Sequence, residues 1–477
     1  MNIFLPILPE LSIFISAVLL LIVGLFVKNI KLIINLTIIT LIIAIILVFV
    51  QPVQSAFNNS LTIDEFSKIA KTLILIGSLA SIVMYHSSRE DLNINLFEYP
   101  ILILLATIGM MIMVSANDLI AIFIGLELQS LTLYVLAALN RNHLASSEAG
   151  LKYFLLGALS SGLLLFGLSY IYGFTGNTNL NLISTTVTSG NIGLIIGIVF
   201  VCSGIAFKVS AVPFHNWAPD TYEGAPTPVT AFLAVASKAA GMVALIQLVF
   251  VAFDNHEVIQ PFFWLIAALT MTIGNLIALR QTNIVRLLAY SGIAQGGFML
   301  VPFAVAGQAS ERALQAIVVY LIIYAFMNLG AFSVVLAVSR KTRSGELESF
   351  GGLFQYAPGL AVAMTIFLAA LAGIPPAGGW FAKFGLFRAL LDAGGAWAAT
   401  LGVVVAINTV IAFAYYARVL GQMWFQPIHE GDERPVKLTS ALGSALVIAL
   451  VATMAFGILP GLVGHFGEVA VLSTLGF

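Results

Sequence analysis

Long apolar runs dominate the chain, and short segments rich in charged, glycine and proline residues separate them. Each run is roughly 20 residues, the length of a helix that crosses a 30 Å hydrocarbon core. Hydrophobic residues make up 60% of the 477 residues and charged residues 9%, whereas soluble domains are about 25% charged. Strands of a membrane barrel would show as alternating segments of about 10 residues. The sequence therefore predicts an all-α polytopic membrane protein with one integral membrane domain, residues 1–477.

Counting the runs predicts about fourteen transmembrane helices, with ends marked by charge, glycine or proline. The predicted spans are residues 4–26, 31–51, 69–86, 98–116, 118–139, 152–174, 191–211, 227–253, 261–280, 286–306, 314–339, 359–391, 396–424 and 438–464.

The distribution of positive charge in the loops predicts the orientation, because lysine and arginine gather on the cytoplasmic side. If the first loop is cytoplasmic, its side holds twelve loop lysines and arginines and the other side three. The cytoplasmic set is Lys28, Lys31, Arg89, Arg141, Lys152, Arg280, Arg286, Arg340, Lys341, Arg343, Arg434 and Lys437, and the outer set is Lys68, Lys71 and Arg312. Both termini are therefore predicted on the outer face.

Two of the predicted spans contain helix-breaking segments. The seventh runs into Pro213, Pro219 and Pro226, and the twelfth carries GIPPAGG at 373–379. Proline removes a helix hydrogen bond and clashes with the preceding turn, so both are predicted to be broken helices. They lie five spans apart, and an odd number of spans reverses the crossing direction. Helices 4–8 and 9–13 are therefore predicted to be two inverted five-helix repeats.

This division assigns a residue range to each part of the membrane domain. The ranges are 1–97 for helices 1–3, 98–253 for the first repeat, 261–424 for the second repeat and 438–464 for the C-terminal helix.

Composition also excludes several classes of function. A net charge of -1 without a long basic run gives no surface for nucleic acid. Cys202 is the single cysteine, so the chain has neither an internal disulfide nor a spacing that could hold zinc or an iron–sulfur cluster. Glu10 precedes the first run without a basic region or a cleavage site, which favours a retained helix over a signal peptide.

Four ionisable residues are predicted inside the membrane: Glu127, Lys208, Lys238 and Lys383. A charge at the bilayer centre costs about 2.5–3.5 kcal/mol on insertion scales, so such residues mark ion or proton pathways. One face of the fifth span joins Glu127 to Ser130 and Tyr134. A buried carboxylate beside a lysine favours an ion pair, and burial disfavours the lysine's charge once the pair opens. Glu127 and Lys208 are the predicted pair.

Each of these residues also has a structural interpretation. Glu127 lies near Asp118 and can be a static, paired carboxylate, and Lys208 near its span end can extend to the interface. Glu148, which opens the sixth span near Arg141 and Lys152, is either a solvated interfacial charge or part of the pathway. His215, Asp220 and Glu223 in the polar linker are assigned first to loop packing or helix capping and second to proton uptake. Other tyrosines and tryptophans are assigned to the interface belt.

Three stretches carry a resemblance to a known family. FKVSAVPFHNWAPDTYEGAPTPVTAFLAVASK at 207–238, LLAYSGIAQGGF at 287–298 and GIPPAGGWFAKF at 373–384 resemble the antiporter-like subunits of respiratory complex I, most closely the subunit N type. The resemblance covers essentially the whole chain. It implies a proton-translocating subunit of NADH:quinone oxidoreductase in the bacterial inner membrane. NADH, FMN, iron–sulfur clusters and quinone would then be bound by partner subunits, and a second antiporter-like subunit would lie beside this one.

The resemblance also implies roles for single residues. Glu127 matches the family's fifth-helix glutamate, Glu148 its second glutamate, Lys208 the seventh-helix lysine, Lys238 the central eighth-helix lysine and Lys383 the twelfth-helix lysine on the exit side. The chain departs from the family pattern at Gln295, where members often carry histidine. Glutamine does not titrate, so a proton step there would pass through water that Gln295 holds.

Two other functions remain open from the sequence. A subunit of a multi-subunit cation/proton antiporter shares the same ancestry, although that group resembles a histidine-bearing pattern at the Lys238 position. A non-conducting scaffold subunit of a membrane hydrogenase or oxidoreductase could keep the buried lysines as a relic.

Overall fold

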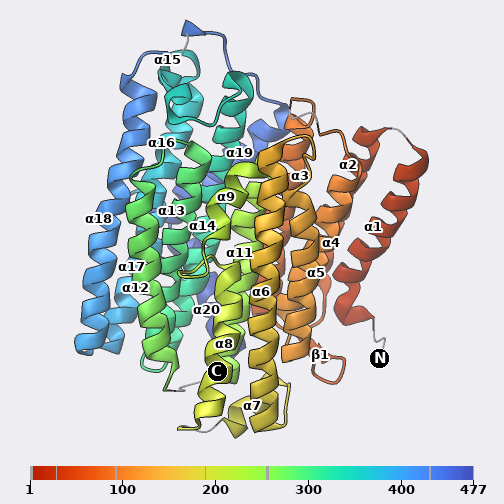
Figure 1. Ribbon diagram of the computed structural model, residues 1–477, viewed down its shortest axis with the longest axis vertical. Coiled ribbons are helices and arrows are strands. Elements are labelled where there is room, and N and C mark those ends of the chain that lie inside the picture. The colour runs from red at the N-terminus through yellow and green to blue at the C-terminus, as the bar shows by residue number, and fades with distance from the viewer. Residues whose placement is uncertain are drawn as a thin grey trace.

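The computed structural model describes residues 4–27, 29–91, 94–187, 190–253, 257–428 and 431–475. They form a bundle of long helices that run roughly side by side, with α1 at one edge and α18 at the other (Figure 1). Within these residues, twelve helices are long and apolar enough to cross a membrane. The predicted all-α membrane fold is confirmed. Lys28, one of the residues used to predict orientation, lies outside the described residues.

The first helices pack together and precede one small hairpin. The elements are η1 (Leu5–Ile7), α1 (Leu8–Phe26), α2 (Ile30–Val50), β1 (Gln54–Ala56), β2 (Leu61–Ile63) and α3 (Glu65–Ser88). The strands pair antiparallel with Ser55 opposite Thr62. A capping box starts α3, because the Asp64 carboxylate accepts from the Ser67 N–H and the Ser67 hydroxyl accepts from the Asp64 N–H.

The middle of the chain contains the first broken helix. Its elements are α4 (Glu98–Ser115), α5 (Leu119–Ala137), α6 (Leu144–Thr175), α7 (Leu180–Thr186), α8 (Ile192–Lys208), α9 (Trp217–Gly224), α10 (Thr227–Phe232), the π-helical turn η2 (Leu233–Ser237), α11 (Lys238–Gln247) and the π-helical turn η3 (Leu248–Ala252). Helix α8, which corresponds to the predicted span 191–211, ends at Lys208, and α9 begins only at Trp217, so the expected break at Pro213 is confirmed.

The rest of the chain contains the second broken helix. Its elements are α12 (Ile259–Ala278), α13 (Ile284–Leu300), η4 (Val301–Val305), α14 (Ser310–Thr342), η5 (Leu347–Phe350), α15 (Leu353–Tyr356), α16 (Pro358–Ala372), α17 (Gly379–Ala393), α18 (Gly395–Phe425), α19 (Ser440–Ile458) and α20 (Gly461–Leu475). The twelfth predicted span is interrupted at 373–378, between α16 and α17, as expected.

Two details of the sequence prediction are wrong. Lys68 and Lys71, which were assigned to a loop, lie in α3, because the helix begins at its Asp64 cap and not at the first apolar residue. The predicted C-terminal helix 438–464 ends at Ile458, and a separate helix follows from Gly461. Pro460 causes this second difference, since it has no N–H to continue the helix.

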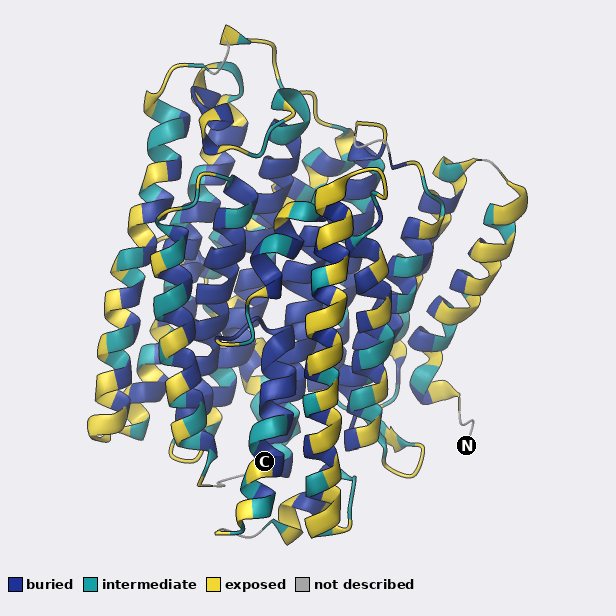
Figure 2. Ribbon diagram, in the orientation of Figure 1, coloured by how far each residue is buried: buried dark blue, intermediate teal, exposed yellow. Residues whose placement is uncertain are grey.

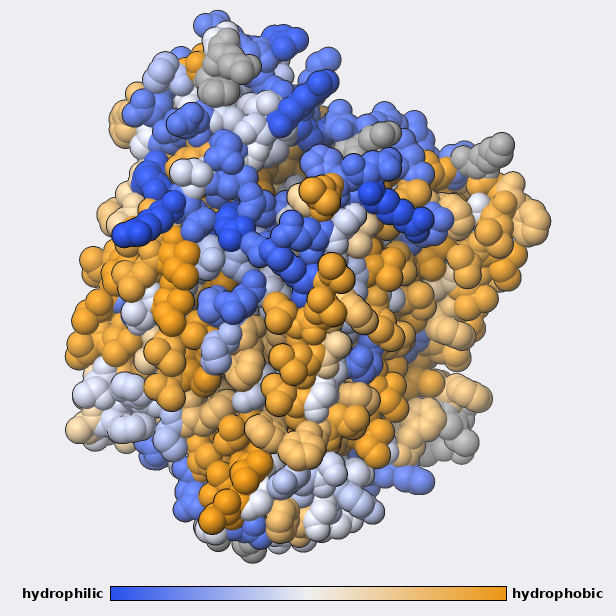
Figure 3. Space-filling model, viewed as in Figure 1, coloured by the Kyte–Doolittle hydropathy of each residue, from blue (hydrophilic) through white to orange (hydrophobic). Residues whose placement is uncertain are grey.

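Burial separates the central helices from the peripheral ones. Figure 2 shows α11, α13 and α14 almost wholly buried, whereas α1, α6 and α18 expose one face along their length. On the face that Figure 3 shows, hydrophobic residues form a broad band across the middle of the bundle, and hydrophilic residues gather above it. An apolar surface of this kind is what a membrane protein presents to lipid. Polar residues are costly in contact with lipid, and here the buried polar residues lie among the helices, inside the bundle.

Candidate functional site

Lys208 is the last residue of α8. The residues that follow it end the helix and turn the chain in another direction. Ser210 adopts a left-handed conformation with φ 60°. Its N–H donates to Phe207 O at 3.0 Å, and the Ala211 N–H donates to Ala206 O at 2.9 Å. These bonds form a Schellman motif, which ends a helix with its last carbonyls satisfied. The Trp217 indole also donates to Phe207 O at 2.9 Å, so α9 is tied to the end of α8.

Aromatic residues surround the Lys208 ammonium, which is 3% exposed. Its Nζ donates to the Tyr153 hydroxyl at 3.3 Å and lies 5.2 Å from that ring's centroid. It also lies 5.5 Å from the Tyr134 ring. Both distances are within the range of cation–π attraction, so a charged Lys208 is stabilised here without a carboxylate contact.

Glu127 and Lys208 do not form the predicted ion pair. Among the described residues, no carboxylate oxygen lies within 4.0 Å of Lys208 Nζ, although Glu127 still acts on it electrostatically. The Glu127 carboxylate instead accepts a hydrogen bond from the Ser161 hydroxyl of α6. Tyr134, two turns along the same face of α5, is the residue that contacts Lys208. The contact between the predicted polar face of α5 and Lys208 is thus made by the ring of Tyr134.

Lys238 begins α11 directly after the π-helical turn Leu233–Ser237. The side chain is 1% exposed, and its Nζ donates to Gly292 O on α13 at 2.5 Å. It lies 5.6 Å from the Tyr324 ring on α14. A Cβ added at Gly241, three residues on, would lie 3.3 Å from Lys208 Cβ. The helices of the two lysines therefore pack closely at this point.

Gln295 occupies the next polar position, and its side chain joins three helices. It accepts from the Tyr320 hydroxyl of α14 at 2.5 Å and donates to Leu371 O of α16 at 2.9 Å. The same amide nitrogen lies 3.4 Å from the Tyr416 hydroxyl of α18. The amide is fully used as donor and acceptor, which fixes its orientation.

Lys383 lies one turn into α17, beyond the second break, and is 4% exposed. Its Nζ reaches back across the break to Ala372 O, the last carbonyl of α16, at 2.9 Å. It also lies 4.6 Å from the Phe298 ring of α13. An ammonium at a helix C-terminus is favoured by the negative end of the helix dipole. The break thus provides the acceptor that holds this lysine.

These residues form a polar row from α5 to α17, in which Glu127 is half-buried and the other four residues are buried. We define the polar row as Glu127, Lys208, Lys238, Gln295 and Lys383. Each lysine can release a proton when charged and take one up when neutral, and its contacts are to hydroxyls, rings and carbonyls. Such an arrangement can hold and pass protons inside the membrane.

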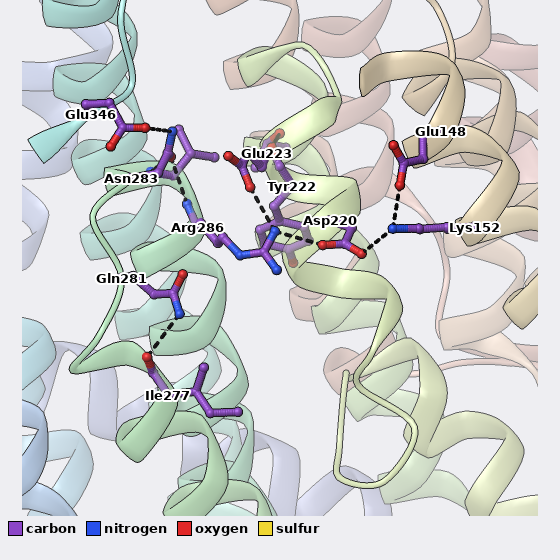
Figure 4. Close-up of polar contacts among 12 residues, drawn as sticks. Glu148, Lys152, Asp220, Tyr222, Glu223, Ile277, Gln281, Asn283, Arg286 and Glu346 are labelled. Carbon is purple, nitrogen blue, oxygen red and sulfur yellow. Dashed lines mark hydrogen bonds and ion pairs between the residues drawn. The ribbon is translucent and has the colours of Figure 1, made fainter. Parts of the chain in front are cut away.

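Glu148 lies outside the polar row, in a separate charge network (Figure 4). Its carboxylate is 2.6 Å from Lys152 Nζ, which is 2.7 Å from Asp220. Arg286 then pairs with Asp220 at 2.7 Å and with Glu223 at 2.8 Å. The network links α6, α9 and α13.

Asp220 lies at the centre of this network, where two cations contact its carboxylate. Burial raises the pKa of the Asp220 carboxyl, but hydrogen bonds from Lys152 and Arg286 outweigh burial and hold this pKa below its ordinary value. The two linker acids Asp220 and Glu223 thus join α9 to the cations of α6 and α13.

His215 is half-buried in the loop between α8 and α9. Its backbone carbonyl accepts from the Ala218 N–H at 2.9 Å at the start of α9. Among the described residues its ring makes no hydrogen bond to a lysine of the polar row.

The tyrosines of the site are the residues that sequence reasoning missed. Tyr153, Tyr320 and Tyr324 are buried among the helices and contact the polar row, whereas the sequence assigned tyrosines to the interface belt. One signal was available: Tyr320, Tyr324 and Asn328 recur every four residues on one face of α14, and the Asn328 amide donates to Tyr324 at 2.7 Å.

Known proteins match this chain over most of its length. The sequence model of the family described as "NADH:quinone oxidoreductase/Mrp antiporter, TM" matches residues 116–409. The NADH-quinone oxidoreductase subunit N of Paramagnetospirillum magneticum is 42% identical, over 95% of this chain and 94% of its own length. The subunit of the same name from Methylobacterium nodulans is 44% identical, over 89% and 87%.

Solved structures agree in fold. A chain of respiratory complex I from Thermus thermophilus matches with a TM-score of 0.82 and 30% identity, over 96% of this chain and 98% of that one. A chain of the Mrp complex from Dietzia sp. matches with a TM-score of 0.87 at 20% identity, over 99% and 98%. Sequence and fold together place this chain in the NADH:quinone oxidoreductase/Mrp antiporter membrane family, among its NADH-quinone oxidoreductase subunit N members.

Proposed function

We propose that this chain is the proton-translocating membrane-arm subunit N of an NADH:quinone oxidoreductase, and that the polar row carries its protons. The observation that carries this proposal is the series of three fully enclosed lysines, Lys208, Lys238 and Lys383, each bonded to a hydroxyl or a backbone carbonyl. Burying three ammonium groups is costly, so a function in proton transfer is a physical reason for their presence. The relatives at 42% identity are named as subunits of an NADH-quinone oxidoreductase.

The geometry supports a stepwise route. Protons would be taken up from the cytoplasmic side near Lys208 and Lys238, pass by way of the amide of Gln295, and leave past Lys383. Neither Lys238 nor Lys383 contacts a carboxylate among the described residues. The positive charge of each ammonium group is therefore stabilised by a backbone carbonyl and an aromatic ring. A new charge nearby therefore shifts its proton affinity, which couples one site to the next.

Energy for the cycle would come from partner subunits of the complex. The relatives are named as subunits of an NADH-quinone oxidoreductase. In this proposal partner subunits would oxidise NADH and reduce quinone on their own FMN and iron–sulfur clusters, and another antiporter-like subunit would lie beside this one. The described residues hold no group of three or more His, Cys, Asp or Glu side chains that could bind a metal ion.

Packing supports the two inverted repeats as part of the proposal. Helix α4 packs along α5 as α12 packs along α13. The long helix α6 packs on both parts of the first broken helix, α8 and α9, and the long helix α14 packs on α16 and α17 of the second. The twelve candidate spans together with these two broken helices make the proposed fourteen crossings. Residues 98–253 and 261–424 would be the repeats, and both termini would lie on the outer face of the bacterial inner membrane.

A cation/proton antiporter subunit is the second candidate. The matching chain of the Mrp complex supports the shared fold, but its 20% identity supports nothing more. Subunit N relatives are 42–44% identical. A non-conducting scaffold would give no reason to keep three enclosed lysines, so proton translocation is the stronger proposal.

Lys238→Ala tests the proposal in the assembled complex. We expect normal amounts of co-purifying subunits and a fall of about tenfold or more in proton uptake by inverted vesicles, with quinone reduction lowered as well, because the central buried donor is removed. Lys31→Ala, an exposed lysine at the start of α2, is the matched control and should pump normally. A normal ratio of protons to electrons in the assembled Lys238→Ala complex would overturn the proposed role.

A further inference from the structure

The end of helix α19 makes contact with the break that holds Lys383. The Gly378 N–H, at the start of α17, donates to Thr453 O of α19 at 2.8 Å. The Trp380 indole donates to Gly457 O of the same helix at 3.1 Å. A third element outside the broken helix thus bonds to both the loop and the first turn of α17.

The contact leaves no space at Gly457. A Cβ added there would lie 1.9 Å from Pro376 O and 2.6 Å from the Ala377 carbonyl carbon. Beyond this contact α19 ends, and Pro460 separates it from α20, which packs on α14 and α3. The last turn of α19 is therefore packed directly against the loop 373–378.

This contact bears directly on Lys383. Trp380 is three residues before Lys383 on α17, so the two lie on adjacent positions of one helix face. The acceptor of Lys383, Ala372 O, lies on the other side of the break at 2.9 Å. The distance across the break depends on how the loop 373–378 holds α16 and α17, and α19 bonds to that loop.

We propose that Trp380 and Gly457 are positioning residues for Lys383: the bond between them fixes α17 relative to α16 and so keeps the Lys383 ammonium on Ala372 O. The inference rests on the proposed proton route through Lys383. It gives the C-terminal pair α19 and α20 a function in proton transfer, in addition to its packing.

Trp380→Phe removes the indole N–H and keeps an aromatic ring. The matched control is Trp264→Phe, because the Trp264 indole also donates to a backbone carbonyl, Trp397 O, at 3.1 Å, in an exposed bond that involves no residue of the polar row. One hydrogen bond corresponds to about a two- to tenfold change in an equilibrium. We expect Trp380→Phe to lower proton uptake per electron by about that factor and Trp264→Phe to leave it unchanged, with equal assembly in both.

A double-mutant cycle separates positioning from general packing. If Trp380 acts through Lys383, then Trp380→Phe should lower proton uptake in the native background and cause no further fall in a Lys383→Ala background. Equal additional falls in both backgrounds, or equal behaviour of the Trp380 and Trp264 variants, would overturn the positioning role. Normal pumping by Lys383→Ala alone would instead contradict the proposed function, so the two failures are distinguishable.

A steric variant gives an independent test. Gly457→Ala should push α19 from the loop and lower proton uptake at least as much as Trp380→Phe, whereas Gly443→Ala on the same helix has nothing within 4 Å and should have no effect. If the Gly457→Ala complex fails to assemble, the double-mutant cycle of Trp380→Phe and Lys383→Ala still tests the positioning role. An assembled Gly457→Ala complex with normal proton uptake would contradict the inference.

Discussion

At the scale of single residues, the buried charges of this protein fall into two kinds. The lysines of the polar row contact carbonyls, hydroxyls and rings, so a protonated lysine keeps an unbalanced charge that its neighbours can influence. Lys71 is different: it is fully buried and lies 2.7 Å from the Glu10 carboxylate, far from the row in α1 and α3. A closed ion pair of this kind is suited to holding helices together rather than to passing protons.

Glu10→Gln should therefore destabilise the N-terminal helices. Removing one partner of a buried pair leaves an uncompensated charge, which costs about 3–5 kcal/mol. We expect a lower thermal unfolding temperature for the purified complex and faster proteolysis near α1.

The double variant Glu10→Leu, Lys71→Met should recover most of that loss, because it removes both charges. Glu65→Gln, which breaks the half-exposed pair with Lys68, is the matched control and should cost at most about 1 kcal/mol. Equal stability of the Glu10 and Glu65 variants would show that the buried pair has no special role.

At the scale of helices, glycine contacts decide where the polar row lies. Gly109 of α4 and Gly125 of α5 face each other so closely that a Cβ at Gly125 would lie 2.7 Å from Gly109 O and 2.9 Å from Met113 N. Both obstacles are backbone atoms, so they cannot move aside as a flexible side chain can. Glu127 is two residues from this contact and is positioned by it.

Gly125→Ala should separate α5 from α4, at a cost of about 1–3 kcal/mol for overpacking. The displaced α5 would weaken the hydrogen bond from Ser161 to Glu127, so we expect lower proton uptake together with lower thermal stability. Gly162→Ala on α6, with nothing within 4 Å, should change neither property. Unchanged stability in Gly125→Ala would contradict the close packing of these helices.

At the scale of the whole molecule, the orientation proposed from the distribution of positive charge can be measured directly. Cys202 is the only cysteine and is buried, so a Cys202→Ala background permits labelling at single introduced cysteines. Asn58, in the turn between β1 and β2, and Glu433, in the segment between α18 and α19, are both exposed.

A membrane-impermeant maleimide added to intact spheroplasts should label Asn58→Cys and not Glu433→Cys, because the positive-charge bias places the second of these segments in the cytoplasm. Permeabilised membranes should allow both to react and serve as the control. The reverse pattern would invert the proposed topology and the direction of the proton route.

Hydropathy and proline positions were sufficient to predict the membrane fold and both breaks, because these depend on local composition and on the missing N–H of proline. They did not give the bounds of α3 or the division of the C-terminal helix into α19 and α20. The three lysines of the polar row were identified from hydropathy too, since each lies in an apolar run, whereas the buried Lys71 was assigned to a loop. Sequence alone could not assign partners, because those depend on which helices pack together.

Tertiary packing alone decided what the lysines contact. It placed Tyr134 against Lys208 in place of the expected Glu127 carboxylate, and it drew Glu148 into a network with Lys152 and Asp220. Packing also brought α19 onto the second break, through residues 77 positions apart in the chain. The sequence of one span shows which residues are apolar and which share a helix face. It does not show which side chains meet, because such contacts depend on the close approach of several helices at once.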